Sequence, residues 1–283
     1  MRIFITGYKG QLGRALYQAL ADHTLEGADL PELDITDRAA ISAAIARFTP
    51  DAVIHTAAWT NVDGCAKDPD EAYRANALGT QSVALACAAQ GCAMLHVSTN
   101  EVFDGAASLP YREWQAPNPI NAYGSSKAAG EWYVRHLLTR FYIVRTAWLY
   151  AAGGRNFPHR MLQLADDVRA GKLPALRVVT DEVSNPTYTP DLAEALARLV
   201  QSEAYGVYHL TNEGYCSRYD FACAILALGG RSDAPVEPIS LAEFQRASTP
   251  PPFAPLANTA AAALGICLRS WRDALAEFLQ DVA

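Results

Sequence analysis

The sequence has no long apolar run, no cluster of basic residues and no leader-like N-terminus, and each absence excludes a class of protein. No apolar stretch reaches the roughly 18 residues that cross a bilayer. The formal net charge is −7 without any basic tract, so neither nucleic acid nor a membrane is an expected partner. The opening apolar segment breaks at Gly7, too early for a signal peptide. We therefore expect a soluble, cytoplasmic protein.

The cysteines are scattered and do not suggest a metal site or a redox motif. None forms a C-x-x-C pair, and none lies in a cluster with histidine. This usage is typical of reduced thiols in the core of an intracellular protein. The six positions are Cys65, Cys87, Cys92, Cys216, Cys223 and Cys267.

Apolar strand-length runs alternate with helix-period segments through the first half of the chain. This alternation predicts a Rossmann-type, doubly wound parallel sheet over residues 1–150. The pattern loosens afterwards, and residues 151–283 are expected to form a smaller α/β substrate-binding lobe, although a strand and helix from about 178–210 return to the sheet. Strands are predicted at 3–6, 51–56, 92–98, 141–146, 176–180 and 206–210. One helix is predicted to begin after Asp37 and to end at Pro50. Further helices are predicted at 69–90, 123–139, 158–170, 190–202, 217–228 and 270–281, with proline-rich breaks at 234–238 and 250–255.

A glycine-rich turn separates the first strand from the first helix. Gly7, Gly10 and Gly13 follow the spacing G-x-x-G-x-x-G. Glycines at such a βα junction let the backbone approach a pyrophosphate, which meets the free N–H groups of the helix N-terminus. Asp29 stands where an acid holds the ribose of NAD, and Arg14 could meet the 2′-phosphate of NADP, so the choice of cofactor stays open.

Two further groups of polar residues indicate chemistry. The strand at 92–98 ends in Ser98 and Thr99, at an edge where ligands of parallel sheets bind. Tyr123 and Lys127 stand four residues apart on one predicted helix face. An ammonium beside a phenol lowers the pKa of the phenol, and such a phenol can give a proton to a carbonyl oxygen as hydride arrives at its carbon.

Taken together, these motifs resemble the extended short-chain dehydrogenase/reductase family, and within it the dTDP-4-dehydrorhamnose reductases. The similarity extends from end to end. It rests on the segments GYKGQLGRAL (7–16), LDITD (33–37), DAVIHTAAWTNVD (51–63), ANALGT (75–80), VSTNEVFDG (97–105), NPINAYGSSKAAGE (118–131), VRTAWLYA (144–151), NPTYTPDLA (185–193) and GVYHLTNEG (206–214).

The resemblance implies an NAD(P)H-dependent oxidoreductase that reduces the 4-keto group of a dTDP-linked 6-deoxyhexose, dTDP-4-dehydrorhamnose to dTDP-L-rhamnose. Tyr123 would be the proton donor, with Lys127 and Thr99 as the other catalytic residues. The substrate would contact Thr99, Asn100 and Trp148. The cofactor, NADPH or NADH, would be bound by Gly7, Gly10, Gln11, Leu12, Asp34, Ile35, Ala57, Ala58, Trp59, Asn76, Ser98, Tyr123 and Lys127.

The chain departs from the commoner family pattern at three positions. Asn100 and Glu101 replace an aspartate and a tyrosine beside the sugar. Ala15 stands where some members have a glutamate that binds a metal between two subunits, so we expect no metal and a monomer or weak homodimer. The diphosphate needs positive groups from the second lobe, for which Arg155, Arg177 and Arg218 are candidates.

Two other functions remain open on sequence grounds. The chain could be a non-catalytic NADP-binding regulator of the methionine adenosyltransferase beta type, although Thr99, Tyr123 and Lys127 are all retained. It could also be a reductase or an epimerase of another nucleotide sugar. The sugar, the base, the cofactor preference and the oligomeric state are not given by the sequence.

Overall fold

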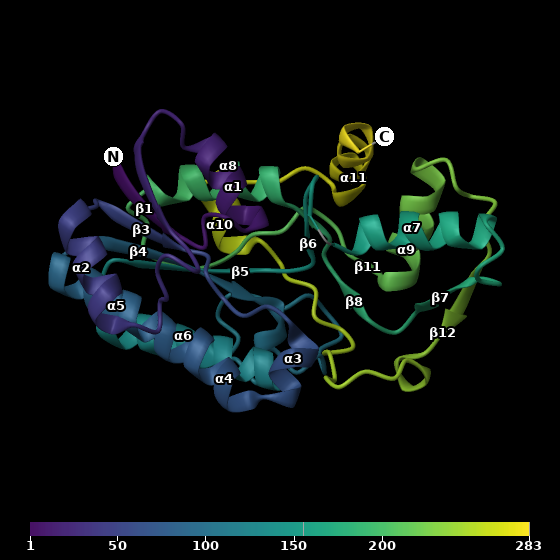
Figure 1. The fold of residues 1–283 in the computed structure, drawn as a ribbon, viewed down its shortest axis with the longest axis horizontal. Coiled ribbons are helices and arrows are strands. Elements are labelled where there is room, and N and C mark those ends of the chain that lie inside the picture. Colours follow the sequence, from purple (N-terminus) through teal and green to yellow (C-terminus); the bar gives the residue numbers. More distant parts are fainter. Residues whose placement is uncertain (155, 283) are drawn as a thin grey trace.

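The computed structural model describes residues 1–154 and 156–282, which form a sheet domain with a smaller lobe at one end (Figure 1). The central sheet has six parallel strands, and this confirms the predicted Rossmann-type class. In spatial order the strands are β2 (Thr24–Ala28), β1 (Arg2–Thr6), β3 (Ala52–His55), β4 (Ala93–Thr99), β5 (Phe141–Thr146) and β10 (Gly206–His209).

Helices cover both faces of the sheet (Figure 1). One face packs against α1 (Gln11–Ala19), α8 (Thr189–Val200) and α10 (Thr259–Ala263), and the other packs against α2 (Arg38–Phe48), α5 (Gly79–Gln90) and α6 (Ala122–Leu137). The inner strands are buried on both sides and are largely apolar, as in β3, where Ala52–His55 are all buried.

The long helix predicted at 69–90 is interrupted. After α3 (Val62–Lys67), α4 (Pro69–Tyr73) passes through a π-helical turn at residues 74–78 into α5. Gly91 ends α5 with φ of 71°, the left-handed conformation expected of this cap. A π turn rotates the side chains that it carries relative to a regular helix, and here it carries Asn76, which is buried.

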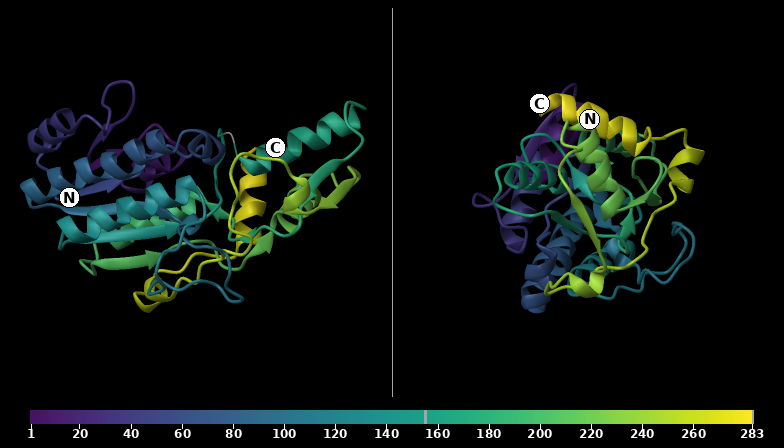
Figure 2. Two further views of the ribbon diagram at one scale, coloured as in Figure 1. Left: turned by 90° about the horizontal axis from the view of Figure 1, so that it is seen from below. Right: turned by 90° about the vertical axis from the view of Figure 1, so that its right-hand side faces the viewer.

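The lobe is built from α7 (Phe157–Arg169), α9 (Arg218–Leu228) and a two-stranded sheet of β7 (Leu176–Val179) and β12 (Val236–Ile239), which projects from the sheet domain (Figure 2). Two short strand pairs complete the fold: β6 (Leu149–Tyr150) with β9 (Thr187–Tyr188), and β8 (Val183–Ser184) with β11 (Cys216–Ser217). Because β10 and α8 lie with the large sheet, we propose the division into residues 1–150 and 151–283 with this return.

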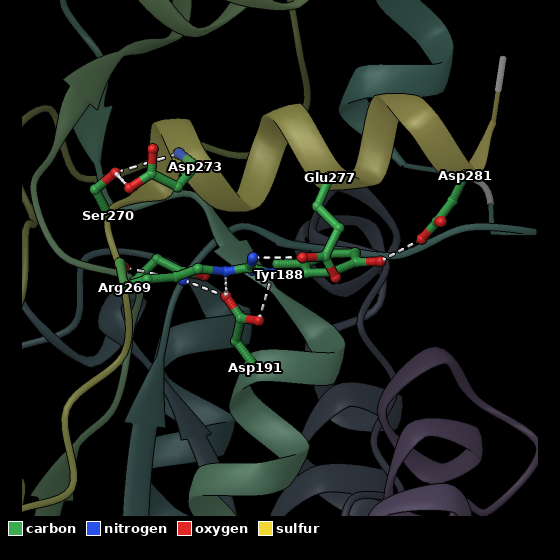
Figure 3. Close-up of polar contacts among 8 residues, drawn as sticks. Tyr188, Asp191, Arg269, Ser270, Asp273, Glu277 and Asp281 are labelled. Atoms are coloured by element: carbon green, nitrogen blue, oxygen red, sulfur yellow. Dashed lines mark hydrogen bonds and ion pairs between the residues drawn. The ribbon is translucent and has the colours of Figure 1, made fainter.

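The C-terminal helix α11 (Trp271–Asp281) is attached to the body by ionic contacts (Figure 3). Arg269, just before it, donates two hydrogen bonds of 2.9 and 2.8 Å to Asp191 of α8 and also pairs with Glu277. The Tyr188 hydroxyl donates to Asp281 at 2.9 Å. These contacts join the helix to α8 and β9.

Two elements differ from the sequence prediction. Strand β2 was not predicted, because its sequence TLEGA contains glycine and glutamate, and it forms only as an edge strand beside β1. The proline-rich break at 234–238 contains most of β12. Proline is tolerated there because β12 pairs only with β7, so Pro238 lies in an edge strand. No helix within the described residues is long and apolar enough to cross a bilayer.

Candidate active site

A cavity of about 810 Å³ opens beyond the carboxyl ends of β1, β3, β4 and β5. This is the edge at which parallel sheets bind ligands. The cavity brings together residues from segments far apart in the sequence. All but one of the predicted site residues line it: Gly7, Gly10, Gln11, Leu12, Asp34, Ile35, Ala57, Ala58, Trp59, Ser98, Thr99, Asn100, Tyr123, Lys127 and Trp148.

The glycine turn forms the floor at one end of the cavity. Gly7 has φ of 74°, and a β-carbon there would lie 2.7 Å from the backbone nitrogen of Ala57, so only glycine fits between the two loops. Gly10 precedes α1 and offers no side-chain cap, which leaves the amides of the first turn available to a ligand. An uncapped helix N-terminus on a cavity wall suits a pyrophosphate.

The end of the cavity beside α2 is lined by Asp34 and Ile35 together with Asp29. The Asp29 carboxylate accepts hydrogen bonds from the backbone amides of Lys9, at 3.0 Å, and Leu30, at 2.8 Å, so it shapes the glycine turn. Arg14 donates to the carbonyl oxygen of Lys9 at 2.8 Å and is not among the lining residues.

Asn76 is the predicted cofactor residue that does not line the cavity. Its Oδ1 accepts a hydrogen bond of 2.7 Å from the backbone amide of Trp59, and its Nδ2 donates to the carbonyl oxygen of the same residue at 3.1 Å. Nδ2 also donates to the hydroxyl of Ser126 on α6 at 3.0 Å. Asn76 therefore holds the cavity loop at Trp59 against the helix that carries Tyr123.

Helix α6 places the tyrosine and lysine. Its N-cap is Asn121, whose Oδ1 accepts from the amide of Gly124 at 2.8 Å, and this cap fixes the first turn around Tyr123. A side chain at position 124 would collide with the carbonyl oxygen of Glu101, so α6 packs closely on the turn that follows Thr99. The phenol and the Thr99 hydroxyl thus share one wall.

Burial raises the pKa of the Tyr123 phenol above its ordinary value, and the negative charge of Glu101 acts in the same direction. The neighbouring side chain of Thr99 opposes this rise. The predicted lowering of the phenol pKa by Lys127 is therefore wrong for this structure: burial raises this pKa, and the ammonium of Lys127, which donates to Val97, is not among the groups that shift it. A phenol that stays protonated at neutral pH still holds the proton that a carbonyl oxygen would take.

Lys127 is 2% exposed and ties α6 to the sheet. Its ammonium donates a hydrogen bond of 2.7 Å to the carbonyl oxygen of Val97 on β4. Burial lowers the pKa of Lys127 to about 8, and the negative charge of Glu131 partly counteracts this.

A buried ion pair joins α6 to the neighbouring strand β5. Arg145, on β5, is fully buried and donates to both carboxylate oxygens of Glu131 on α6, at 2.9 and 2.7 Å. The Ser98 hydroxyl donates to the same carboxylate at 2.6 Å. Sequence reasoning missed Glu131 and Arg145, although a charged residue inside the apolar run 141–146 is a signal for a buried partner.

At the lobe end, Trp148 lines the cavity in the left-handed backbone conformation, with φ of 45°. The guanidinium of Arg218 stacks 3.6 Å from the centre of its indole ring and pairs with Glu182 at 3.0 Å. Arg177 lies on β7 near Glu237 and does not line the cavity. Arg155 lies outside the described residues.

Asn100 reaches the cavity, but its amide also joins the two parts of the molecule. Nδ2 donates to the Ser184 hydroxyl at 3.1 Å and to the carbonyl oxygen of Ala254 at 3.3 Å. Its Oδ1 accepts from the hydroxyl of Thr99 at 3.3 Å. The residue thus links β4 to segments of the lobe beside the cavity.

A parallel sheet with a glycine turn, an uncapped helix and a Thr–Tyr–Lys wall defines a nicotinamide-dinucleotide oxidoreductase of the short-chain type. The whole chain, residues 1–283, matches the model of the RmlD substrate binding domain. The chain belongs to this family, which confirms the resemblance seen in its sequence.

Individual relatives agree over nearly their full lengths. The chain is 40% identical to the dTDP-4-dehydrorhamnose reductase of Mycobacterium tuberculosis, covering 98% of this chain and 92% of the relative. It is 34% identical to the dTDP-4-keto-6-deoxy-D-glucose reductase of Streptomyces niveus, covering 98% and 96%. The structure of the dTDP-4-dehydrorhamnose reductase of Bacillus anthracis, solved in complex with NADP, superimposes with a TM-score of 0.94 at 35% identity, covering 99% of both chains.

Proposed function

We propose that the protein reduces the 4-keto group of a dTDP-linked 6-deoxyhexose, converting dTDP-4-dehydrorhamnose to dTDP-L-rhamnose with NADPH or NADH. The observation that carries this proposal is that Thr99, Tyr123 and Lys127 line the same cavity as the glycine turn. The relatives from M. tuberculosis and B. anthracis, which bear the name of this activity, support it.

The reduced nicotinamide, when bound, would supply a hydride to the keto carbon. Tyr123 would give its proton to the keto oxygen, and the Thr99 hydroxyl would hold that oxygen in place. Lys127 would keep α6 in register with β4 through Val97 and present a positive charge near the ribose. The Trp148 ring, fixed by Arg218, would pack on the sugar.

The residues fit a dinucleotide over the length of the cavity. The first turn of α1 would bind the pyrophosphate, and Asp34 and Ile35 would flank the adenosine. Ser98 and the loop of Ala57, Ala58 and Trp59 would line the nicotinamide half. Asn76 would act on the cofactor only through Trp59.

A second candidate is the reduction of a different dTDP-4-keto sugar, which the relative from S. niveus favours. The two differ in the configuration of the substrate and product. Incubation with NADPH or NADH and a panel of dTDP- and UDP-linked 4-keto-6-deoxyhexoses, followed by NMR of each product sugar, separates them. Oxidation of the cofactor with formation of dTDP-L-rhamnose supports the main proposal.

The turnover assay and a separate assay of bound cofactor address the remaining functions. Binding of cofactor without turnover of any sugar would support a regulator. Stoichiometric NAD released from the denatured protein would support an epimerase. Either result would refute the proposed reduction.

A further inference from the structure

Glu101 is a carboxylate on the cavity wall with one oxygen bound and one free. It follows Thr99 and Asn100 and lines the cavity beside Tyr123. Oε2 accepts a hydrogen bond of 2.7 Å from Nδ2 of Asn121. Oε1 has no hydrogen-bond partner among the residues that the structure describes. A free anionic oxygen on a ligand cavity is an acceptor for a ligand donor.

The position of this carboxylate is fixed from three sides. The backbone amide of Glu101 donates to the Thr99 hydroxyl at 3.2 Å, and its carbonyl oxygen packs against Gly124. Asn121 holds the side chain while it caps α6 and donates to the carbonyl oxygen of Thr249 at 3.0 Å. Glu101 is thus fixed relative to Tyr123, on which its charge acts.

The pKa of Glu101 is raised, so the protein alone stabilises its ionised form incompletely. Burial raises the pKa of the Glu101 carboxyl, and the negative charge of Glu182 acts in the same direction. The hydrogen bond from Asn121 and the charges of Arg246 and Arg218 oppose this rise. Arg218 is paired with Glu182, and Arg246 with Asp63 at 3.1 Å, so neither arginine is bound to Glu101. A ligand that displaces water from this wall must supply the missing hydrogen bond, because an unpaired buried charge is costly.

The chemistry of the sugar then identifies the donor. In a 4-keto-6-deoxyhexose the keto carbon has two neighbours: C5 bears a methyl group, and C3 bears a hydroxyl. With the keto oxygen at Tyr123 and Thr99, the nearest sugar hydroxyl is the one on C3. We propose that Glu101 accepts a hydrogen bond from the 3-hydroxyl of the keto sugar and thereby selects substrates that carry it; this rests on the proposed function.

The test is a comparison of kcat/KM for the parent sugar nucleotide with that for its 3-deoxy analogue, and the 2-deoxy analogue is the matched control substrate. We expect the wild-type protein to prefer the parent over the 3-deoxy sugar by on the order of 100-fold. Glu101→Gln and Glu101→Ala should reduce this preference at least tenfold and leave the preference over the 2-deoxy sugar unchanged.

A matched variant is Glu71→Gln, the same substitution in an acid that lines the opposite end of the cavity and pairs with Arg74. It should leave the discrimination between the parent and the 3-deoxy sugar as in the wild type. A purely structural role of Glu101 would lower the rates on all three sugars together and keep their ratios, and that result would overturn the assignment.

The outcomes separate the two proposals. A wild-type protein that reduces the parent sugar but prefers it over the 3-deoxy sugar by less than tenfold refutes the role of Glu101 alone, even where a variant fails to fold. A protein that reduces no keto-sugar nucleotide refutes the proposed function, and the role of Glu101 with it.

Discussion

Lys127 donates a hydrogen bond of 2.7 Å to the carbonyl oxygen of Val97, two residues before Thr99 on β4. The bond joins the helix that carries Tyr123 to the strand that carries Thr99. Because both partners are on regular elements, the distance between the phenol and the hydroxyl is set by the packing of α6 on β4 rather than by a loop. The ammonium therefore has a structural role in addition to any role toward a ligand.

The stability of the protein should depend on pH through Lys127. Its pKa falls from 10.5 to about 8 on folding, so the folded state binds fewer protons than the unfolded state between these values. Burial of the charge is therefore unfavourable below about pH 8, and this penalty decreases as the pH rises toward 10. The wild type should therefore gain on the order of 2 kcal/mol in its free energy of unfolding, relative to Lys127→Met, between pH 7 and pH 10.

Urea unfolding of both proteins at each pH measures this difference, and the comparison cancels the groups that they share. A difference that stays constant across this range would show that the pKa of Lys127 is not lowered by folding.

The buried pair of Glu131 and Arg145 should be far more costly to break than to replace. Glu131→Gln leaves Arg145 without its charged partner in the core, and we expect a loss of about 3–5 kcal/mol in the free energy of unfolding. In a cycle of the wild type, Glu131→Leu, Arg145→Met and the double variant, the double variant should lose less than the sum of the losses in the two single variants. Denaturant unfolding of the four proteins gives the coupling; single losses that simply add would argue against a shared network.

Asn76 should affect the affinity for the cofactor although it does not line the cavity. Asn76→Leu keeps the volume but leaves the amide and carbonyl of Trp59 unpaired, so the cavity loop loosens. We expect the dissociation constant for NADPH, measured by titration calorimetry, to rise about tenfold, the effect of about 1.4 kcal/mol.

Asn118→Leu is the control for this change, because Asn118 is an exposed amide that bonds Asp104. Equal affinities of the Asn76 and Asn118 variants would show that the bonds to Trp59 do not position the loop.

The sequence predicted those parts of the site whose signals are local. Gly7, Gly10 and Gly13 mark a tight turn by their spacing, and Tyr123 and Lys127 share a helix face because they are four residues apart. The strand end at Ser98 and Thr99 could be placed at the ligand edge because every parallel strand ends there. These residues do line one cavity.

The remainder depends on contacts between distant segments, which no local pattern records. The bonds from Asn76 to Trp59 cross 17 residues and require a π turn that the helical periodicity hides. The partner of Arg145 lies on another element, and the raised pKa of Tyr123 arises from burial that the spacing of tyrosine and lysine does not reveal. Strand β2 forms only because β1 offers it an edge.

The transfer of a proton from Tyr123 is the claim on which the account depends, and Tyr123→Phe tests it most directly. The change removes one hydroxyl and retains the ring, so NADPH affinity should stay within about threefold of the wild type, a free-energy change below about 0.7 kcal/mol. Single-turnover oxidation of bound NADPH by dTDP-4-dehydrorhamnose should slow by at least about 100-fold, the usual contribution of a general acid. Oxidation at the wild-type rate, with cofactor and sugar both bound, would contradict the account.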